Sequence, residues 1–180
     1  MIQPGQKLDI SVSFHALIDG EKTPCTLADL LKRRTVLSVY MKNNTSACDV
    51  QTMQLATATT DFDKLGWDII AISKDTCNSH KKYAEKQGIA YTLVSDPDYN
   101  LTRAADALVQ KSMYGKKFLG PLRCAILVEA DGTVLGVIEK INAKAHAEEL
   151  KAFDADGYRF QPGDSSEDLW VFSRPQPAPK

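Results

Sequence analysis

Three features that would indicate particular classes of protein are missing from this sequence. Its 180 residues carry 22 basic and 23 acidic side chains, so no excess of positive charge is available to bind nucleic acid or an anionic membrane. No apolar run approaches the roughly 20 residues that a membrane-spanning helix needs. The N-terminus lacks the apolar stretch behind a basic start that is typical of a secretory leader. We therefore expect a cytoplasmic protein that binds neither nucleic acid nor membrane.

Paired cysteines are also missing. Cys25, Cys48, Cys77 and Cys124 lie far apart in the sequence, and no C-x-x-C pair occurs. This spacing argues against a zinc site and against a dithiol redox motif of the thioredoxin kind. We expect reduced thiols, no metal ion and no cofactor. Most free cysteines are small buried hydrophobic residues, so a reactive cysteine can be distinguished from them only by its position.

The apolar pattern that is present predicts a hairpin followed by alternating strands and helices. Asp19-Gly20 and Asp131-Gly132 supply turn signals for two hairpins. The order favours an α/β, thioredoxin-like fold, in which a central mixed sheet is flanked by helices and preceded by an N-terminal β-hairpin. The expected elements are a hairpin over 14–24, helices over 26–32, 48–65, 79–87, 101–107 and 145–153, and strands over 35–41, 67–72, 91–95, 123–129 and 133–138.

The composition changes near residue 154, which predicts a domain over residues 1–153 and a C-terminal extension over residues 154–180. The extension contains an acidic run and a proline-rich end, with four consecutive apolar residues between them. A linker rarely carries two large aromatic residues so close together. We therefore predict that Trp170 and Phe172 pack on the domain or on a partner subunit, and a loose tail is the alternative.

Cys48 is the cysteine whose position favours reactivity. It follows a β-rich run and a polar turn, and it lies at or just inside the start of the next predicted helix. The unpaired N–H groups and the dipole of a helix N-terminus favour an anion over a neutral thiol. Because the thiolate is the reactive form of cysteine, we predict that Cys48 is a nucleophile.

The residues before this cysteine, Met41-Lys-Asn-Asn-Thr-Ser-Ala-Cys48, resemble the Pro-x-x-x-Thr-x-x-Cys signature of the peroxiredoxins. The resemblance spans roughly residues 5–150. Within the peroxiredoxins, the sequence is similar, in register, to the bacterioferritin-comigratory (Q-type) subfamily. It implies a thiol peroxidase that reduces hydrogen peroxide and organic hydroperoxides with electrons from thioredoxin, glutaredoxin or a small thiol. The oligomeric state is left open, and both a monomer and a homodimer are compatible with the sequence. The further matching segments are Ser79–Gly88, Leu93–Pro97, Met113–Lys117 and His146–Leu150.

The resemblance also implies roles for three residues. Cys48 would attack the O–O bond and become a sulfenic acid. The hydroxyl of Thr45 would hydrogen-bond the peroxide and the thiolate, and the guanidinium of Arg123 would favour the thiolate and hold the peroxide oxygens. Taken without the resemblance, Thr45 could be a helix cap and Arg123 a surface ion-pair residue. Met41 and Ala47 depart from the family motif, which has proline and glycine at these positions.

A resolving cysteine is not found where the resemblance would place it. The two family positions are occupied here by Met53 and, in the following helix, Ala84. Cys77 lies two helical turns before Ala84 on the same face and follows the strand expected beside that of Cys48. A two-cysteine cycle through Cys77 and a one-cysteine cycle both stay open.

The other candidate residues are given structural interpretations. We expect His15, His80 and His146 to be surface or capping residues, and Cys124 to be a packing residue on a buried strand. Cys25, placed near an exposed loop, could be either a packing or a reactive residue.

Two other functions compete with the peroxidase. One is a redox sensor or binding module on the same fold, with weakened peroxidase activity. The other is a thiol–disulfide oxidoreductase, against which the missing C-x-x-C motif counts.

Overall fold

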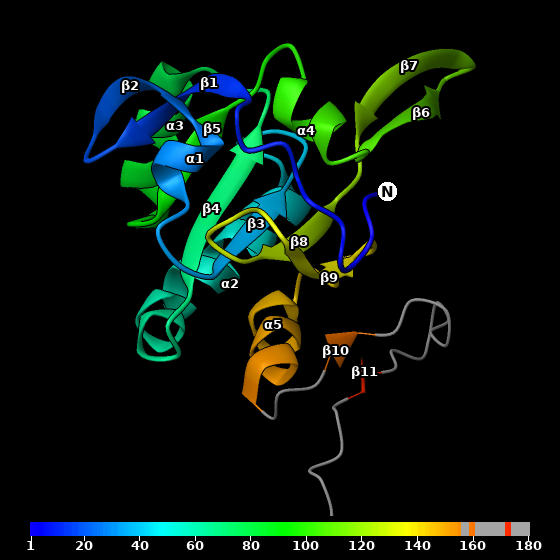
Figure 1. Ribbon diagram of the computed structural model, residues 1–180. Helices are drawn as coiled ribbons and strands as arrows, with labels where there is room; N and C mark the ends of the chain where they lie inside the picture. Colours follow the sequence, from blue (N-terminus) through cyan, green and yellow to red (C-terminus); the bar gives the residue numbers. More distant parts are fainter. Residues whose placement is uncertain (156–158, 161–171, 174–180) are drawn as a thin grey trace, which may run out of the picture.

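The computed structural model describes residues 1–155, 159–160 and 172–173. A seven-stranded sheet lies at its centre with helices on both faces (Figure 1). The three strands β3, β4 and β5 are parallel, and the outer strands pair antiparallel. This is the predicted mixed sheet. In spatial order the strands are β2 (Glu21–Thr26), β1 (Ser13–Ile18), β5 (Thr92–Ser95), β4 (Asp68–Ser73), β3 (Thr35–Val39), β8 (Cys124–Val128) and β9 (Val134–Ile138).

The two faces of the sheet are covered by different helices. Successive residues of a strand point to opposite faces, so Val36 belongs to one core cluster and Leu37 to the other. The first cluster includes side chains of α2, α3 and α5, and the second includes side chains of α1 and α4. None of the helices within residues 1–155 is long and apolar enough to cross a membrane. The helices are α1 (Leu27–Leu30), α2 (Ser46–Lys64), α3 (Cys77–Gln87), α4 (Asn100–Ala104) and α5 (His146–Ala155).

Local sequence signals account for most of these boundaries. The β1–β2 turn has positive φ angles at Asp19 and Gly20, 50° and 79°, as an Asp-Gly hairpin requires. A capping box opens α1, where Thr26 and Asp29 bond each other reciprocally. Gly88 ends α3 in the left-handed conformation.

The sequence patterns did not predict the hairpin between α4 and β8. Strands β6 (Leu108–Met113) and β7 (Lys116–Pro121) form a separate two-stranded hairpin that projects from the body of the protein (Figure 1). Its turn is built from Tyr114 and Gly115, both with positive φ. A tyrosine is rarely found in that conformation, so the segment lacks an ordinary hairpin signal. The predicted helix over 101–107 is also shorter than expected, since α4 ends at Ala104.

The predicted boundary at residue 153 falls inside the last turn of α5, which continues to Ala155. Beyond it, β10 (Arg159–Phe160) pairs antiparallel with β11 (Phe172–Ser173), and β10 also contacts β9 and α5. Trp170 lies outside the described residues. The division into a domain and an extension, and the packing of Trp170 and Phe172, stay predictions.

Candidate active site

Cys48 lies in the first turn of α2, directly after the loop that follows β3. Thr45 is the N-cap residue of this helix, and its carbonyl accepts the first helical bond from the N–H of Asp49 at 2.8 Å. Ala47 also lies in this first turn and is exposed to solvent, so a residue with a side chain fits where the family motif has glycine. Cys48 itself is only 1% exposed. The structure therefore confirms the predicted position of this cysteine at a helix N-terminus.

Polar groups around the sulfur favour the thiolate of Cys48. Its Sγ lies 3.6 Å from Nη2 of Arg123, which donates to it. Burial raises the pKa of Cys48, but hydrogen bonds from the Thr45 hydroxyl and the backbone of Lys42 and Met41, together with the charge of Arg123, outweigh burial. The net effect is a pKa below the ordinary value of a cysteine thiol. The sulfur is thus almost fully enclosed, yet it is surrounded by donors that stabilise an anion.

The hydroxyl of Thr45 lies in the environment of the sulfur and does not cap the helix N–H groups. As the N-cap residue it makes no side-chain hydrogen bond to the helix N–H groups. Its Oγ1 instead donates its single proton to the carbonyl of Lys42 at 2.9 Å. By turning about its C–O bond the same hydroxyl can donate to Cys48, whose pKa it lowers. The capping interpretation, which was the alternative for this residue, therefore does not describe its side chain.

Arg123 reaches the cysteine because of the sheet topology. It directly precedes β8, and β8 pairs antiparallel with β3, so that Val39, near the end of β3, lies opposite Cys124. The loop that leads to Cys48 starts from this end of β3, which brings the guanidinium beside the start of α2. Its Nε is buried and has no hydrogen-bond partner among the described residues. One donor of the guanidinium therefore stays free while another is bound to sulfur.

The lowered pKa of Cys48 predicts the pH dependence of its reaction with peroxide. Only the thiolate attacks, so the rate should be constant above the lowered pKa and should decrease as the pH falls through it. We expect the midpoint of this profile to lie below that of a free cysteine. Stopped-flow measurement of the oxidation rate against pH, with free cysteine measured in parallel, checks this. A midpoint at or above the value for free cysteine would contradict the proposed environment of the sulfur.

Replacing Thr45 tests the hydroxyl separately. Thr45→Val removes the donor and keeps the shape of the side chain, so the pKa of Cys48 should rise and the rate of peroxide reaction should fall by about tenfold or more, as expected for a hydrogen bond to a charged group. Thr45→Ser keeps the donor and should stay close to the wild type. Titration of the thiolate absorbance of Cys48 measures the first effect. Equal rates for the valine and serine variants would rule out a role for the hydroxyl.

A buried polar network holds the loop between β3 and Cys48. Asn43 donates from Nδ2 to Nδ1 of His80 at 3.2 Å, and its Oδ1 accepts from the hydroxyl of Tyr40 at 2.6 Å. Nε2 of His80 lies 3.1 Å from the carbonyl of Val94. Burial lowers the pKa of His80, so the ring is neutral, with Nε2 as donor and Nδ1 as acceptor.

The expectation that His80 is a surface or capping residue is therefore wrong. The side chain is completely buried because α3 turns its Cys77, His80 and Tyr83 positions toward the protein. A spacing of three residues on a helix is a signal that could have shown this. The same expectation is wrong for His146, which is also completely buried and lies 3.2 Å from the Ser38 hydroxyl. Burial lowers the pKa of His146 to about 3.

The third histidine follows the expectation. His15 lies in β1, and its side chain is exposed to solvent.

Cys77 lies in a different part of the molecule from Cys48. It opens α3 and lies near Ser95 of β5 and Lys22 of β2, both of which act to lower its pKa. Those strands belong to the far half of the sheet, whereas Cys48 lies near β3 and β8. Burial raises the pKa of Cys77, which disfavours its thiolate. Both cysteines are free thiols in this structure, and the resolving role of Cys77 stays a prediction.

The other two cysteines occupy packing positions. Cys124 is completely buried in β8, and burial raises its pKa to about 12. Cys25, which the sequence placed near an exposed loop, lies within β2, opposite Phe14. It is partly exposed, and burial, followed by the charges of Asp29 and Cys77, raises its pKa.

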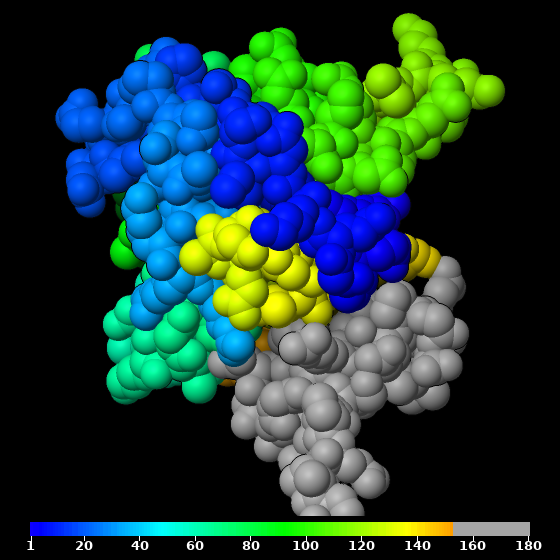
Figure 2. All heavy atoms as spheres, viewed as in Figure 1, coloured from blue at the N-terminus to red at the C-terminus, as the bar shows by residue number. Residues whose placement is uncertain are grey.

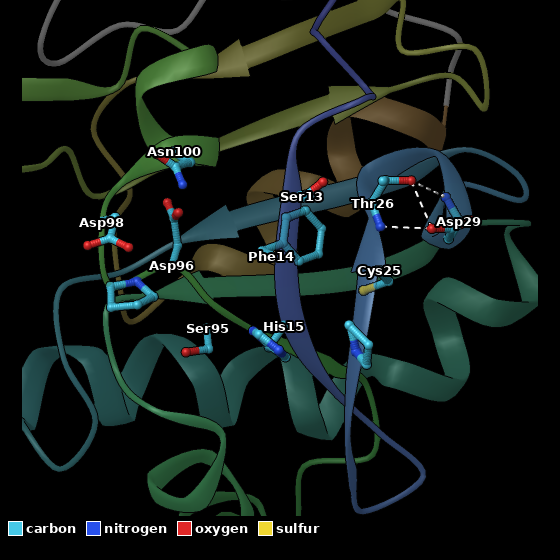
Figure 3. Close-up of a pocket in the computed structure, with 12 residues that line it drawn as sticks. Ser13, Phe14, His15, Cys25, Thr26, Asp29, Ser95, Asp96, Asp98 and Asn100 are labelled. Carbon is cyan, nitrogen blue, oxygen red and sulfur yellow. Dashed lines mark hydrogen bonds between the residues drawn. The ribbon is translucent and has the colours of Figure 1, made fainter.

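A cavity of about 510 Å³ lies beside Cys25, away from the Cys48 site. Figure 3 shows the side chains that line it, from the β1–β2 hairpin and from the segment that leads into α4. The carboxylate of Asp29 in this view is bound to Thr26, and that of Asp96 accepts from the N–H groups that open α4. Two of the three acidic side chains that line the cavity, Asp29 and Asp96, thus have structural partners. No group of three or more His, Cys, Asp or Glu side chains in the described part of the chain could hold a metal ion.

Comparison with known proteins agrees with this geometry. Residues 6–137 match the model of the AhpC/TSA family. A Peroxiredoxin Bcp from Xanthomonas campestris is 36% identical over 117 residues, which cover 65% of this chain and 73% of that protein. The Peroxiredoxin Bcp of Escherichia coli K12 is 30% identical over 138 residues, covering 77% of this chain and 88% of that protein.

Among solved structures, Xanthomonas campestris Peroxiredoxin Q has a TM-score of 0.73 with 31% sequence identity, and the match covers 84% of this chain and 93% of that one. A PrxQ variant from Xylella fastidiosa has a TM-score of 0.75 with 25% identity, covering 83% of this chain and 93% of that one. The strand-to-helix cysteine, its arginine and the fold thus occur together in a chain similar to these proteins. This chain belongs to the AhpC/TSA family and, within it, to the peroxiredoxins of the bacterioferritin-comigratory type, which are thiol peroxidases.

Proposed function

We propose that this peroxiredoxin reduces hydroperoxides through Cys48 as its peroxidatic cysteine. The thiolate of Cys48 attacks the terminal oxygen of the peroxide, an S–O bond forms and the O–O bond breaks. The leaving oxygen takes a proton and departs as water or an alcohol, and Cys48 becomes a sulfenic acid. The observation that carries the proposal is the Arg123–Cys48 contact of 3.6 Å at a helix N-terminus, where the pKa of the thiol is lowered.

Arg123 and Thr45 have distinct tasks in this step. The guanidinium stabilises the thiolate, and its unpartnered Nε is a second donor that can hold a peroxide oxygen. The Thr45 hydroxyl favours the thiolate and can donate to the oxygen on which negative charge develops. The guanidinium is in place before the reaction, and the hydroxyl has only to turn from the carbonyl of Lys42, so little reorganisation is needed in the transition state.

The substrates we propose are hydrogen peroxide and organic hydroperoxides. A solved structure of the Xanthomonas campestris bacterioferritin comigratory protein, 30% identical to this chain, is described by its alkyl peroxide reduction activity. The exposed apolar residues Val50 and Met53 on α2, close to Cys48 along the chain, offer a surface for an alkyl group. Thioredoxin, glutaredoxin or a small thiol returns the electrons. The cytoplasm, where thiols stay reduced, suits a protein with four unpaired cysteines.

Mass spectrometry after addition of one equivalent of hydrogen peroxide tests the proposal. We expect a single added oxygen on Cys48, detected as a sulfenic acid by a dimedone-type trap. A persistent sulfenic acid indicates a one-cysteine cycle, and a Cys48–Cys77 disulfide indicates a two-cysteine cycle. Oxidation of another cysteine first would contradict the assignment of Cys48.

The alternative is a redox sensor or binding module on the same fold with weakened peroxidase activity. The departure at Met41 favours it, since the residue that replaces the family proline is partly exposed beside the site. Stopped-flow oxidation distinguishes the two functions. A rate near that of a free thiol would support the sensor, and a rate several orders of magnitude higher would support the peroxidase.

A further inference from the structure

A second cation lies beside the Cys48 site. Lys111 of β6 is half-buried, and its Nζ lies 3.2 Å from Sδ of Met41. Met41 in turn packs against the core cluster that contains Cys48. The hairpin that carries Lys111 stands out from the body of the protein at the upper right of Figure 2. The lysine midway along its first strand is thus directed back toward the site, where it meets the residue that replaces the family proline.

The register of the hairpin separates Lys111 from Lys117. Lys111 lies opposite Phe118, and Ser112 lies opposite Lys117. Since neighbouring residues of a strand point to opposite faces, Lys111 and Lys117 lie on different faces of the hairpin. The contact with Met41 identifies the face of Lys111 as the one that borders the site. Lys117 therefore offers a matched control of the same charge on the same hairpin.

Cys48, Arg123 and Lys111 are electrostatically coupled. Burial and the nearby charge of Arg123 lower the pKa of Lys111, whereas the charge of the Cys48 thiolate raises it. While Cys48 is a thiolate, one negative charge faces two positive ones. A sulfenic acid is neutral, so the oxidised site keeps both cations without compensation. Its attraction for an anion therefore increases when the peroxide step is complete.

The oxidised site must then be reduced by a thiolate. The positions of the family's resolving cysteines hold Met53 and Ala84, and Cys77 lies near Ser95, in another part of the sheet, with a raised pKa. The attacking thiol therefore comes from outside the chain in this arrangement. Because Cys48 is 1% exposed, a small molecule reaches it more easily than a cysteine fixed in a folded partner.

We propose that Lys111 selects the reductant, and that this reductant is a small thiol with an additional negative charge, such as a thiol carboxylate. The proposal rests on the assignment of Cys48 as the peroxidatic cysteine. The thiolate attacks Sγ of the Cys48 sulfenic acid, an S–S bond forms and the S–O bond breaks. The oxygen leaves as water with a proton from the solvent. The thiol is oxidised to the mixed disulfide, and the sulfenic acid is reduced. The ammonium of Lys111 pairs with the carboxylate of the thiol as it approaches.

The test separates the reductive step from the peroxide step. The protein is oxidised with one equivalent of hydrogen peroxide and mixed with 3-mercaptopropionate, 2-mercaptoethanol or cysteamine, which have similar sizes and different charges. The rate of mixed-disulfide formation is followed by quenching and mass spectrometry, and it is divided by the concentration of thiolate. In the wild type we expect the carboxylate thiol to react roughly tenfold faster than cysteamine.

The variants show whether Lys111 causes this preference. Lys111→Met should remove it, mainly by slowing the carboxylate thiol, and Lys111→Arg should keep it. Lys117→Met removes the same charge from the other face of the hairpin and should behave as the wild type. A Lys111→Met protein that keeps the preference, or a Lys117→Met protein that loses it equally, would overturn the proposal. Absence of any charge preference in the wild type would do so as well.

The peroxide step is measured first in each protein. If the wild type forms no sulfenic acid at Cys48, the proposed function is wrong and this inference fails with it. If the sulfenic acid forms normally and the three thiols react alike, only the choice of reductant is contradicted. Added salt provides a second readout, because screening should reduce the advantage of the carboxylate thiol and leave 2-mercaptoethanol almost unaffected.

Discussion

Replacing Cys48 with serine is expected to reduce the rate of peroxide consumption by at least about three orders of magnitude, to the level of the reaction without enzyme. The hydroxyl of serine has no accessible anion at neutral pH, whereas the environment of Cys48 lowers the pKa of its thiol. The donors from Thr45 and Arg123 cannot compensate, because they stabilise a charge that serine does not carry. Peroxide consumption with a thiol reductant in excess measures the effect directly.

The matched control is Cys25→Ser, which changes a partly exposed cysteine in β2 whose pKa is raised. We expect this variant to keep the activity of the wild type. Circular dichroism and thermal unfolding of both variants show whether the fold is intact. Peroxide consumption that survives in the Cys48→Ser protein, or that is lost in the Cys25→Ser protein, would place the nucleophile elsewhere.

Replacing Arg123 with methionine is expected to slow the attack on peroxide by about a hundredfold to a thousandfold, the usual loss when a donor that stabilises developing charge is removed. Methionine keeps much of the volume of the arginine side chain but removes the donor 3.6 Å from Sγ of Cys48. The pKa of Cys48 should rise at the same time, since burial would then be opposed by fewer favourable groups. Stopped-flow rates across a pH series separate the loss of thiolate from the loss of peroxide positioning.

Arg123→Lys restores the charge without the planar pair of donors, so it should recover the pKa of Cys48 more completely than the rate. Arg103→Met is the control, because Arg103 is an exposed residue of α4, and α4 packs on the other face of the sheet. A rate and a thiol pKa in Arg123→Met that match those of Arg103→Met would rule out the proposed role of the guanidinium.

Sequence patterns predicted the elements that depend on neighbouring residues. The Asp19-Gly20 turn and the glycine that ends α3 appear in the structure where local conformational preferences require them. The position of Cys48 is of the same kind, because a strand, a polar turn and a helix start follow one another within a short segment. The hairpin of β6 and β7 was not predicted, because the sequence signal of its Tyr114-Gly115 turn is weak.

Contacts across the fold could not be predicted in this way. His80 is surrounded in sequence by serine and lysines, yet it is completely buried against Asn43. Cys77 shares a helix face with Ala84, but its partners lie in β5 and β2. In both cases the orientation of α3 on the sheet determines the surroundings. Helix periodicity limits the possible faces, and only packing decides which face is turned inward.

The sequence by itself determined the order of strands and helices apart from β6 and β7, the placement of a cysteine at the start of α2 and the resemblance that led to the family. These depend on local conformational preferences and on short motifs, which are readable along the chain. The tertiary structure alone decided that Arg123, 75 residues from Cys48, donates to its sulfur and that Lys111 reaches Met41 from 70 residues away. Electrostatic stabilisation depends on the distance in space between charges, and that distance is set by the pairing of strands and the packing of helices.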